Sequence, residues 1–362
     1  MSIRFPIVRP VLPDLQQYQN YIDGVFNRTW LTNGGPLHQE LEQRLADYLG
    51  VKHLMLVGNG TLALQIAYKA LGLGKQVITT PFSFAATASS LAWQDHQCEF
   101  VDIHSKSLNI DPQLISQQQW RQLDGLVATH VFGNPCAVEE IETLAVKHNT
   151  KVIYDAAHAF GCQYKGQSLL KWGDASTLSL HATKMFHTVE GGAIIFKNEK
   201  DLLKAKQLIN FGFDMKQFPE HVGINSKMSE VHAAMGLALL DNIGEIQQQR
   251  IESIECYQSQ LGSMVEFQCW EEGSSNNGAY MPIILESEQQ VLKVMAQLLE
   301  KGIQTRRYFY PSLSQVPCYG MAGNTPIAND ISQKILCLPL YFGLAENDIA
   351  YITAALKQAL AS

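Results

Sequence analysis

The chain has 362 residues, which exceeds a single domain of about 150 residues and is enough for a large core. Apolar residues make up 46% of it and charged residues 17%, which excludes a disordered chain and indicates a well-buried globular protein. The net charge of -7, with no large cluster of lysine and arginine, argues against a nucleic-acid-binding protein.

The N-terminal stretch and the cysteines indicate the cellular compartment of the protein. Three prolines precede Asp14, where a signal peptide would need an unbroken apolar segment, and no apolar run approaches the ~18 residues of a membrane span. The seven cysteines are scattered without a Cys-x-x-Cys pair, which fits reduced thiols and not disulfides or a structural zinc. We therefore expect a soluble, cytoplasmic protein.

An irregular arm of 35 residues opens the chain, with a polar helix expected at 15–27. An Asn-Gly-Gly turn at 33–35 follows, and Pro36 suits the first turn of a helix that continues to residue 49. From residue 51 onward, strand and helix patterns alternate. Strands are expected at 53–57, 77–80, 98–103, 126–131, 152–154, 177–180 and 193–196, and helices at 62–71, 84–93 and 138–148. This alternation predicts an α/β fold with a central, mostly parallel seven-stranded sheet between helices.

The last third of the chain has a different pattern. A helix-rich stretch at 229–260, longer than a typical globular helix, leads to weaker strands at 280–285 and 335–338 and to helices at 288–301 and 346–360. We therefore predict a large domain of residues 1–240, which includes the arm, and a smaller α+β C-terminal domain of residues 241–362.

Lys184 lies in a polar turn between the two apolar segments 177–180 and 193–196. Burial between strands disfavours the ammonium form of lysine, and the uncharged amine is the form that attacks a carbonyl to give a Schiff base. A lysine in a loop more often points into solvent. The surrounding motifs must therefore decide between these two roles.

The segment Gly-Asn-Gly-Thr at 58–61 lies between a strand and a helix. Its glycines allow a tight turn, and the free N–H groups at the helix start can hold a phosphate, although a plain turn is the alternative. The spacing also matches a dinucleotide-binding fingerprint, which requires an acidic residue at the end of the next strand. No carboxylate follows until Asp95, so the phosphate interpretation is kept and a nicotinamide dehydrogenase is disfavoured.

Asp155 ends an apolar strand, at the edge of a parallel sheet where ligands bind. It could keep a heterocyclic nitrogen protonated, or it could cap the helical turn that follows. His158 would share this edge, or serve a structural role. The histidines at 130, 158, 181 and 187 lack metal-ligand spacing, so we expect no metal. Together, the phosphate turn, Asp155 and Lys184 suit pyridoxal 5'-phosphate, a phosphorylated pyridine aldehyde.

These motifs resemble those of the DegT/StrS-type nucleotide-sugar aminotransferases, pyridoxal-phosphate enzymes of fold type I. The resemblance covers nearly the whole chain and is strongest to members that form dTDP-4-amino-4,6-dideoxyhexoses. Its pieces include Asn-Gly-Thr-Leu-Ala-Leu at 59–64, Pro-Phe-Ser-Phe-Ala-Ala-Thr-Ala at 81–88, Tyr-Asp-Ala-Ala-His-Ala-Phe-Gly at 154–161, Ser-Leu-His-Ala-Thr-Lys at 179–184, Glu-Gly-Gly-Ala at 190–193 and Gly-Ile-Asn-Ser-Lys-Met-Ser-Glu at 223–230.

The resemblance implies a role for each site residue. Lys184 would form the Schiff base with the cofactor and move a proton between cofactor and substrate, Asp155 would pair with the ring nitrogen, and His158 would contact the phenolic oxygen. The remaining cofactor contacts that it implies are Phe84, stacked on the ring, the phosphate ligands Gly60, Thr61 and Ser179, and Asn225, reaching the phosphate from the neighbouring subunit. The last assignment implies a homodimer with shared active sites.

Four residues are candidates for binding substrate: Glu190, Arg306, Arg307 and Tyr308. Glu190 lies in the loop after the lysine. The two arginines could meet a diphosphate and the tyrosine a base or sugar, while a solvated basic edge is the alternative for these three.

The resemblance implies an aminotransferase that passes an amino group from L-glutamate to C4 of a nucleotide-linked 4-keto-6-deoxyhexose. The expected substrate is dTDP-4-keto-6-deoxyglucose, and the expected product is dTDP-4-amino-4,6-dideoxyglucose for surface polysaccharide such as lipopolysaccharide O-antigen. The segment 81–87 favours position 4, because it is similar to that of 4-aminating relatives. The alternatives are the galactose configuration at C4, amination at C3, and a non-catalytic regulator that binds pyridoxal phosphate.

Two segments depart from the pattern of many relatives. Ser226 and Lys227 stand where tyrosine and arginine are common, so the contacts between subunits that those residues make are in doubt. Met185 stands where asparagine is common. Lys184 itself is kept, which excludes the branch that has histidine there and dehydrates sugars.

Overall fold

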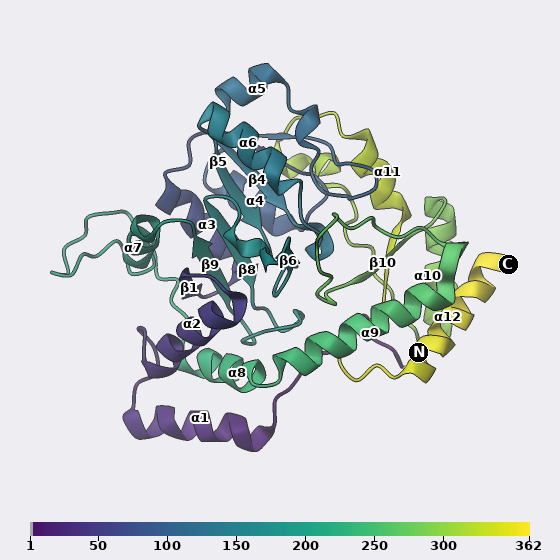
Figure 1. The fold of residues 1–362 in the computed structure, drawn as a ribbon, viewed down its shortest axis with the longest axis horizontal. Helices are drawn as coiled ribbons and strands as arrows, with labels where there is room; N and C mark the ends of the chain where they lie inside the picture. Colours follow the sequence, from purple (N-terminus) through teal and green to yellow (C-terminus); the bar gives the residue numbers. More distant parts are fainter. Residues whose placement is uncertain (1–2) are drawn as a thin grey trace.

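A seven-stranded sheet forms the centre of the structure, a computed structural model that describes residues 3–362 (Figure 1). Its order is β1-β9-β8-β5-β4-β2-β3. The strands are β1 (His53–Val57), β2 (Gln76–Thr79), β3 (Gln97–Phe100), β4 (Gly125–Thr129), β5 (Lys151–Asp155), β8 (Ala175–Ser179) and β9 (Gly192–Phe196). Strands β3, β2, β4, β5 and β8 pair in parallel, whereas β9 is antiparallel to both β8 and β1. The predicted α/β fold with a mostly parallel seven-stranded sheet is confirmed.

Helices cover both faces of this sheet because successive strand residues point to opposite sides. In β1, Leu54 and Leu56 join the core beneath α2 (Pro36–Leu49), α6 (Val138–His148) and α8 (Glu230–Leu240). Met55 and Val57 join the opposite core beneath α3 (Gly60–Leu71), α4 (Ala85–Trp93) and α7 (Glu199–Leu208). The strands are therefore buried on both faces, as crossover helices require.

The N-terminal arm folds back onto the helices that cover the central sheet. Its helix α1 (Leu15–Arg28) packs against α8, and the turn after it places both Asn33 and Gly34 at positive φ. The buried Glu230 side chain then accepts hydrogen bonds from the first free N–H groups of α2, at Leu37 (3.0 Å) and His38 (2.8 Å). A carboxylate at this helix start satisfies donors that the helix cannot satisfy itself.

The helix-rich stretch predicted at 229–260 is made of two helices. α8 ends at Leu240 and α9 (Ile243–Leu261) begins after a turn at Asp241 and Asn242. α8 is apolar nearly all round and is buried between α1 and α2, whereas α9 leaves the sheet to pack on α12 (Glu346–Ala361). Figure 1 shows α9 running from α8 towards α10 and α12.

The C-terminal part has its own core. The antiparallel pair β10 (Met281–Ile284) and β11 (Ile335–Leu338) packs with α9, α10 (Glu288–Glu300) and α12, while α11 (Pro326–Lys334) faces the large sheet layer. Phe5 belongs to this core, and its backbone pairs with Gly302 and Gln304. Further short elements include α5 (Gln117–Gln122) and the hairpin of β6 (Gln163–Tyr164) and β7 (Gln167–Ser168). Among the residues described, no helix is both long and apolar enough to cross a membrane.

Candidate active site

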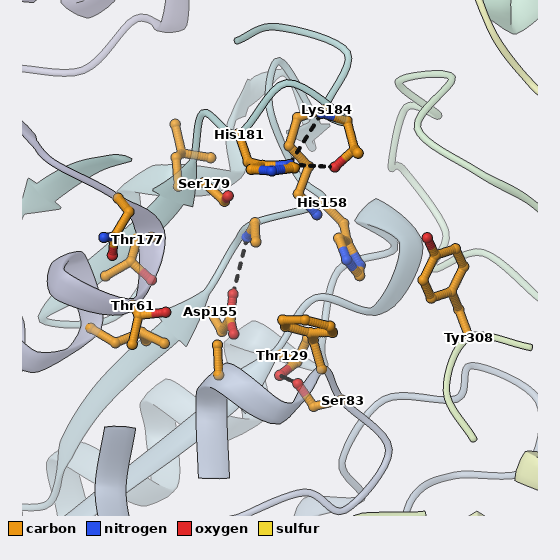
Figure 2. Close-up of a pocket in the computed structure, with 18 of the residues that line it drawn as sticks. Thr61, Ser83, Thr129, Asp155, His158, Thr177, Ser179, His181, Lys184 and Tyr308 are labelled. Atoms are coloured by element: carbon orange, nitrogen blue, oxygen red, sulfur yellow. Dashed lines mark hydrogen bonds between the residues drawn. The ribbon is translucent and has the colours of Figure 1, made fainter. Parts of the chain in front are cut away.

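A cavity of about 350 Å³ opens at the carboxyl ends of β4, β5 and β8 (Figure 2). These parallel strands end at one edge of the sheet, where ligands of open α/β sheets bind. The C-terminal part of the chain contributes Tyr280 and residues of the segment 306–309 to the cavity wall. Ten of the residues predicted from the sequence line it: Gly60, Thr61, Phe84, Asp155, His158, Ser179, Lys184, Glu190, Arg306 and Tyr308.

The start of α3 forms one end of the cavity. Asn59 caps the helix by accepting a hydrogen bond from the Leu62 N–H at 2.8 Å, so the N–H groups of the first turn are held in place. A Cβ on Gly60 would lie 2.9 Å from Ser179 Cβ, so glycine is required for this close approach. The helix start and the hydroxyls of Thr61 and Ser179 fit a phosphate group.

Asp155 forms the floor of the cavity and is buried. Its Oδ2 accepts a hydrogen bond from Thr87 Oγ1 at 2.7 Å, and its Oδ1 accepts one from the Ala157 N–H at 3.2 Å. Burial raises the pKa of Asp155, while the bond from Thr87, that from Ala157 and the nearby Lys184 act against this rise. A buried carboxylate in this position fits a protonated ring nitrogen.

His158 is buried against Phe132 and Phe309, whose rings are nearly parallel to its own. Its Nδ1 accepts a hydrogen bond from the Phe132 N–H at 3.2 Å, which assigns the proton of the neutral ring to Nε2. Burial holds the pKa of His158 well below its usual value, and the charge of Lys184 lowers it further. His158 is thus a neutral donor that can bind an anionic oxygen in the cavity.

Lys184 lies on the turn between β8 and β9, where its N–H donates to the His181 carbonyl at 2.8 Å. Its Nζ donates a hydrogen bond to the Tyr280 hydroxyl at 3.1 Å. Figure 2 shows Lys184, His158, Asp155 and Thr61 around one cavity. An amine, a carboxylate, a neutral donor and a phosphate site in this arrangement fit the four functional groups of pyridoxal phosphate.

Two predicted residues do not line this cavity. Asn225 is exposed and pairs with Asn210 in an isolated bridge on the loop after α7. Arg307 donates to Glu288 Oε1 at 2.7 Å and stacks on the Tyr310 ring. The structure thus separates Arg307, whose guanidinium is held by Glu288, from the residues around Lys184.

Three further residues belong to the site but were missed in the sequence. Thr87 contacts Asp155, Tyr280 contacts Lys184, and Phe309 stacks on His158 at 5.6 Å. Thr87 lies within the motif at 81–88, one helical turn after Phe84, so its position could have been predicted. Phe309 directly follows the candidate Tyr308 and could have been included with it, whereas Tyr280 lies far from the motifs in the sequence and carries no local signal. Within residues 3–362, no group of three or more His, Cys, Asp or Glu side chains is placed to hold a metal ion.

The chain is similar in sequence and in structure to known aminotransferases. Residues 14–357 match the model of the DegT/DnrJ/EryC1/StrS aminotransferase family. The chain is 38% identical to an Escherichia coli dTDP-4-amino-4,6-dideoxy-D-glucose transaminase, over 97% of each chain. It is 37% identical to the protein of that name from Shigella dysenteriae, over 97% of this chain and 98% of the relative. A solved structure of DesI, determined in the presence of its TDP-sugar product, matches with a TM-score of 0.93 and 30% identity, covering 99% of this chain and 94% of DesI.

Proposed function

The chain belongs to the DegT/DnrJ/EryC1/StrS aminotransferase family, and from this premise we propose that it transfers an amino group from L-glutamate to C4 of a nucleotide-linked 4-keto-6-deoxyhexose. The proposed substrate is dTDP-4-keto-6-deoxyglucose and the product dTDP-4-amino-4,6-dideoxyglucose, because the E. coli and S. dysenteriae relatives carry that product in their names. The observation that carries the proposal is the convergence of Lys184, Asp155 and the start of α3 on one cavity.

The family uses pyridoxal phosphate, which when bound supplies an electron sink for negative charge at the reacting carbon. Gly60, Thr61 and Ser179 would hold its phosphate, and Asp155 its ring nitrogen. His158 would donate from Nε2 to its phenolic oxygen, since its Nδ1 is occupied by the Phe132 N–H.

Lys184 has two tasks in this proposal. Its amine is the point of covalent attachment, and when it is free the same amine takes a proton from the substrate carbon and returns one. Asp155 keeps the ring nitrogen protonated by staying ionised beside it. Over the two half-reactions, glutamate leaves as its keto acid and the keto sugar leaves as the amino sugar.

Three residues at the cavity mouth are proposed to bind the sugar nucleotide. The exposed Arg306 lies over the Tyr308 ring at 4.9 Å and supplies positive charge for a diphosphate. Glu190 lies 3.7 Å from His181 Nε2 and supplies an acceptor for sugar hydroxyls. Arg307 is left out of this set because Glu288 holds it.

We propose that the enzyme is a homodimer with shared active sites. The loop after α7 projects from the body (Figure 1) and exposes Phe211, Met215, Phe218 and Val222, of which Met215 is 99% exposed. Apolar side chains gathered on one projecting loop favour a protein partner. A second copy of the chain covering this loop would bring Asn225 towards the other cavity.

Three experiments test these assignments. The loaded protein should be yellow, and borohydride should fix the cofactor on Lys184. Lys184→Ala should keep the cofactor noncovalently and lose turnover. A colourless protein would overturn the proposal, and a yellow protein inert towards every keto sugar with glutamate would favour a regulator. NMR of the product decides between the glucose and galactose configurations and between C4 and C3.

Mixing inactive Lys184→Ala and Asn225→Ala subunits tests the shared site. Each mixed dimer would contain one site with both side chains intact, so activity should return on mixing. Activity that stays at the level of the two parents would contradict a contribution from Asn225 across the dimer.

The proposed location of the enzyme is the cytoplasm, which the scattered cysteines support. The proposed end use of its product is surface polysaccharide.

A further inference from the structure

We propose that Tyr280 is a positioning residue for Lys184, holding the free amine at the point in the cavity where it attacks the cofactor. The Tyr280 hydroxyl accepts a hydrogen bond from Lys184 Nζ at 3.1 Å. Lys184 otherwise stands on a turn with a flexible four-carbon side chain, which loses rotamer freedom when its amine is fixed. A fixed acceptor at its tip removes that freedom before the cofactor arrives.

The Tyr280 ring has little room to move. It packs on His158 with ring centroids 4.6 Å apart, on Phe132 at 5.4 Å and on Tyr308 at 5.5 Å. Two of these neighbours, His158 and Tyr308, line the same cavity. The hydroxyl therefore has a defined position relative to both the cofactor site and the substrate side.

The segment that follows β5 holds the backbone that precedes Tyr280. The Asn277 amide donates to the carbonyls of His158 (2.8 Å) and Phe160 (2.9 Å), which ties this turn to the segment after β5. Gly278 has a φ of 74°, and a Cβ there would lie 2.7 Å from Arg250 Cβ. Glycine is therefore required for the turn that delivers Tyr280.

Arg250 holds the same turn from the other side. Within residues 3–362 its buried guanidinium forms no salt bridge, and it donates to the carbonyls of Gly278 (2.7 Å), Ala279 (2.9 Å) and Leu340 (3.2 Å). Burying a charge on carbonyls alone is costly, and burial lowers the pKa of Arg250 to about 10. The two carbonyls directly before Tyr280 are thus both fixed by the Arg250 side chain.

Positioning predicts a specific kinetic effect in Tyr280→Phe, which keeps the ring and removes only the hydroxyl. The rate at which pyridoxal phosphate becomes attached to the cofactor-free protein, followed by absorbance, should fall roughly tenfold, because one oriented hydrogen bond is lost. Binding of 4'-deoxypyridoxine phosphate, which has no aldehyde and needs no lysine, should keep its Kd. Tyr164→Phe loses a hydroxyl that contacts Glu139, outside the cavity, and should attach the cofactor at the wild-type rate.

The outcomes separate this inference from the proposed function on which it rests. If borohydride does not fix the cofactor on Lys184 in the wild-type protein, the role of the lysine itself is wrong. If fixation occurs and Tyr280→Phe attaches the cofactor at the wild-type rate, only the role of Tyr280 is wrong. A parallel loss of affinity for the aldehyde-free analogue would indicate a structural role and would also overturn the inference.

Discussion

The hydroxyl of Thr87 donates a 2.7 Å hydrogen bond to Asp155 Oδ2, joining the first turns of α4 to the end of β5. Ser83 lies behind it and bonds both Thr87 and Thr129, so the carboxylate is oriented by a chain of hydroxyls. This chain fixes the oxygen that would face the ring nitrogen and favours its ionised form.

Thr87→Val should therefore weaken cofactor binding without unfolding the protein. Valine has the shape of threonine and leaves Asp155 without its hydroxyl donor, which raises the pKa of the buried carboxyl further. We expect Kd for pyridoxal phosphate to rise about tenfold, measured by fluorescence titration. Ser89→Ala on the same helix removes a hydroxyl that contacts Tyr319, and should keep the affinity. Equal affinities for Thr87→Val and wild type would contradict the role of Thr87.

Gly60→Ala should impair the phosphate site by sterics alone. The added methyl would lie 2.9 Å from Ser179 Cβ and 3.2 Å from Ser179 Cα, so α3 and the end of β8 must separate. Both sides of this contact are proposed to bind the phosphate, and we expect Kd to rise more than tenfold, by about 1.4 kcal/mol or more. The readout is titration with pyridoxal phosphate and with inorganic phosphate.

Gly244→Ala is the matched control for this substitution. Gly244 lies in the first turn of α9, and a Cβ there would meet no atom of the described residues within 4 Å. This variant should bind cofactor normally and gain up to ~1 kcal/mol of stability from helix propensity. Normal phosphate affinity in Gly60→Ala would show that the close approach to Ser179 is not required.

The central sheet could be predicted from the sequence because its strands and helices alternate with strong local patterns. The bounds of β1, α6 and β11 were correct to the residue. The same reasoning placed Lys184, Asp155 and the start of α3 at one edge of the sheet, because each lies at or shortly after the end of a predicted strand and parallel strand ends share one edge.

The sequence could not predict contacts that depend on tertiary packing. The third strand was expected at 98–103 and ends at Phe100, because the Phe100 N–H bonds the Ala322 carbonyl and Asp102 leaves the sheet to reach α11. Arg307 was expected beside Arg306, but successive residues of an extended segment point in opposite directions, and its partner Glu288 is visible only in the fold.

Asp102 is expected to stabilise the contact between the two parts of the chain. Its buried carboxylate accepts hydrogen bonds from the Ile327 and Ala328 N–H groups, both at 2.8 Å, at the start of α11. Asp102→Ala leaves these donors unsatisfied and should cost about 2–3 kcal/mol in urea unfolding. Asp102→Asn keeps an acceptor and should cost less. Equal losses for the two variants would mean that packing, not capping, is responsible.

His130 should make the protein sensitive to acid. Its ring is buried and stacks on Tyr154 at 4.4 Å, its Nδ1 accepts from the Cys136 N–H at 3.1 Å, and its Nε2 has no hydrogen-bond partner among residues 3–362. Burial lowers the pKa of His130 to about 3, against about 6.5 for the unfolded chain. Between these values the unfolded state binds the proton and the folded state does not, so the free energy of unfolding falls as the pH drops below ~6.5. Burial also lowers the pKa of His158 and of His187, and both act in the same direction.

His130→Phe should reduce this acid sensitivity. The slope of unfolding free energy against pH should decrease by up to about 1.4 kcal/mol per pH unit between pH 4 and 6, while stability at pH 7.5 falls by ~1–3 kcal/mol because the Cys136 N–H loses its acceptor. Urea unfolding of the cofactor-free protein at a fixed concentration measures both quantities. His104→Asn, at an exposed turn where asparagine can also accept, should leave the slope unchanged. An unaltered slope in His130→Phe would mean that His130 takes up its proton in the folded state, against its buried, stacked position.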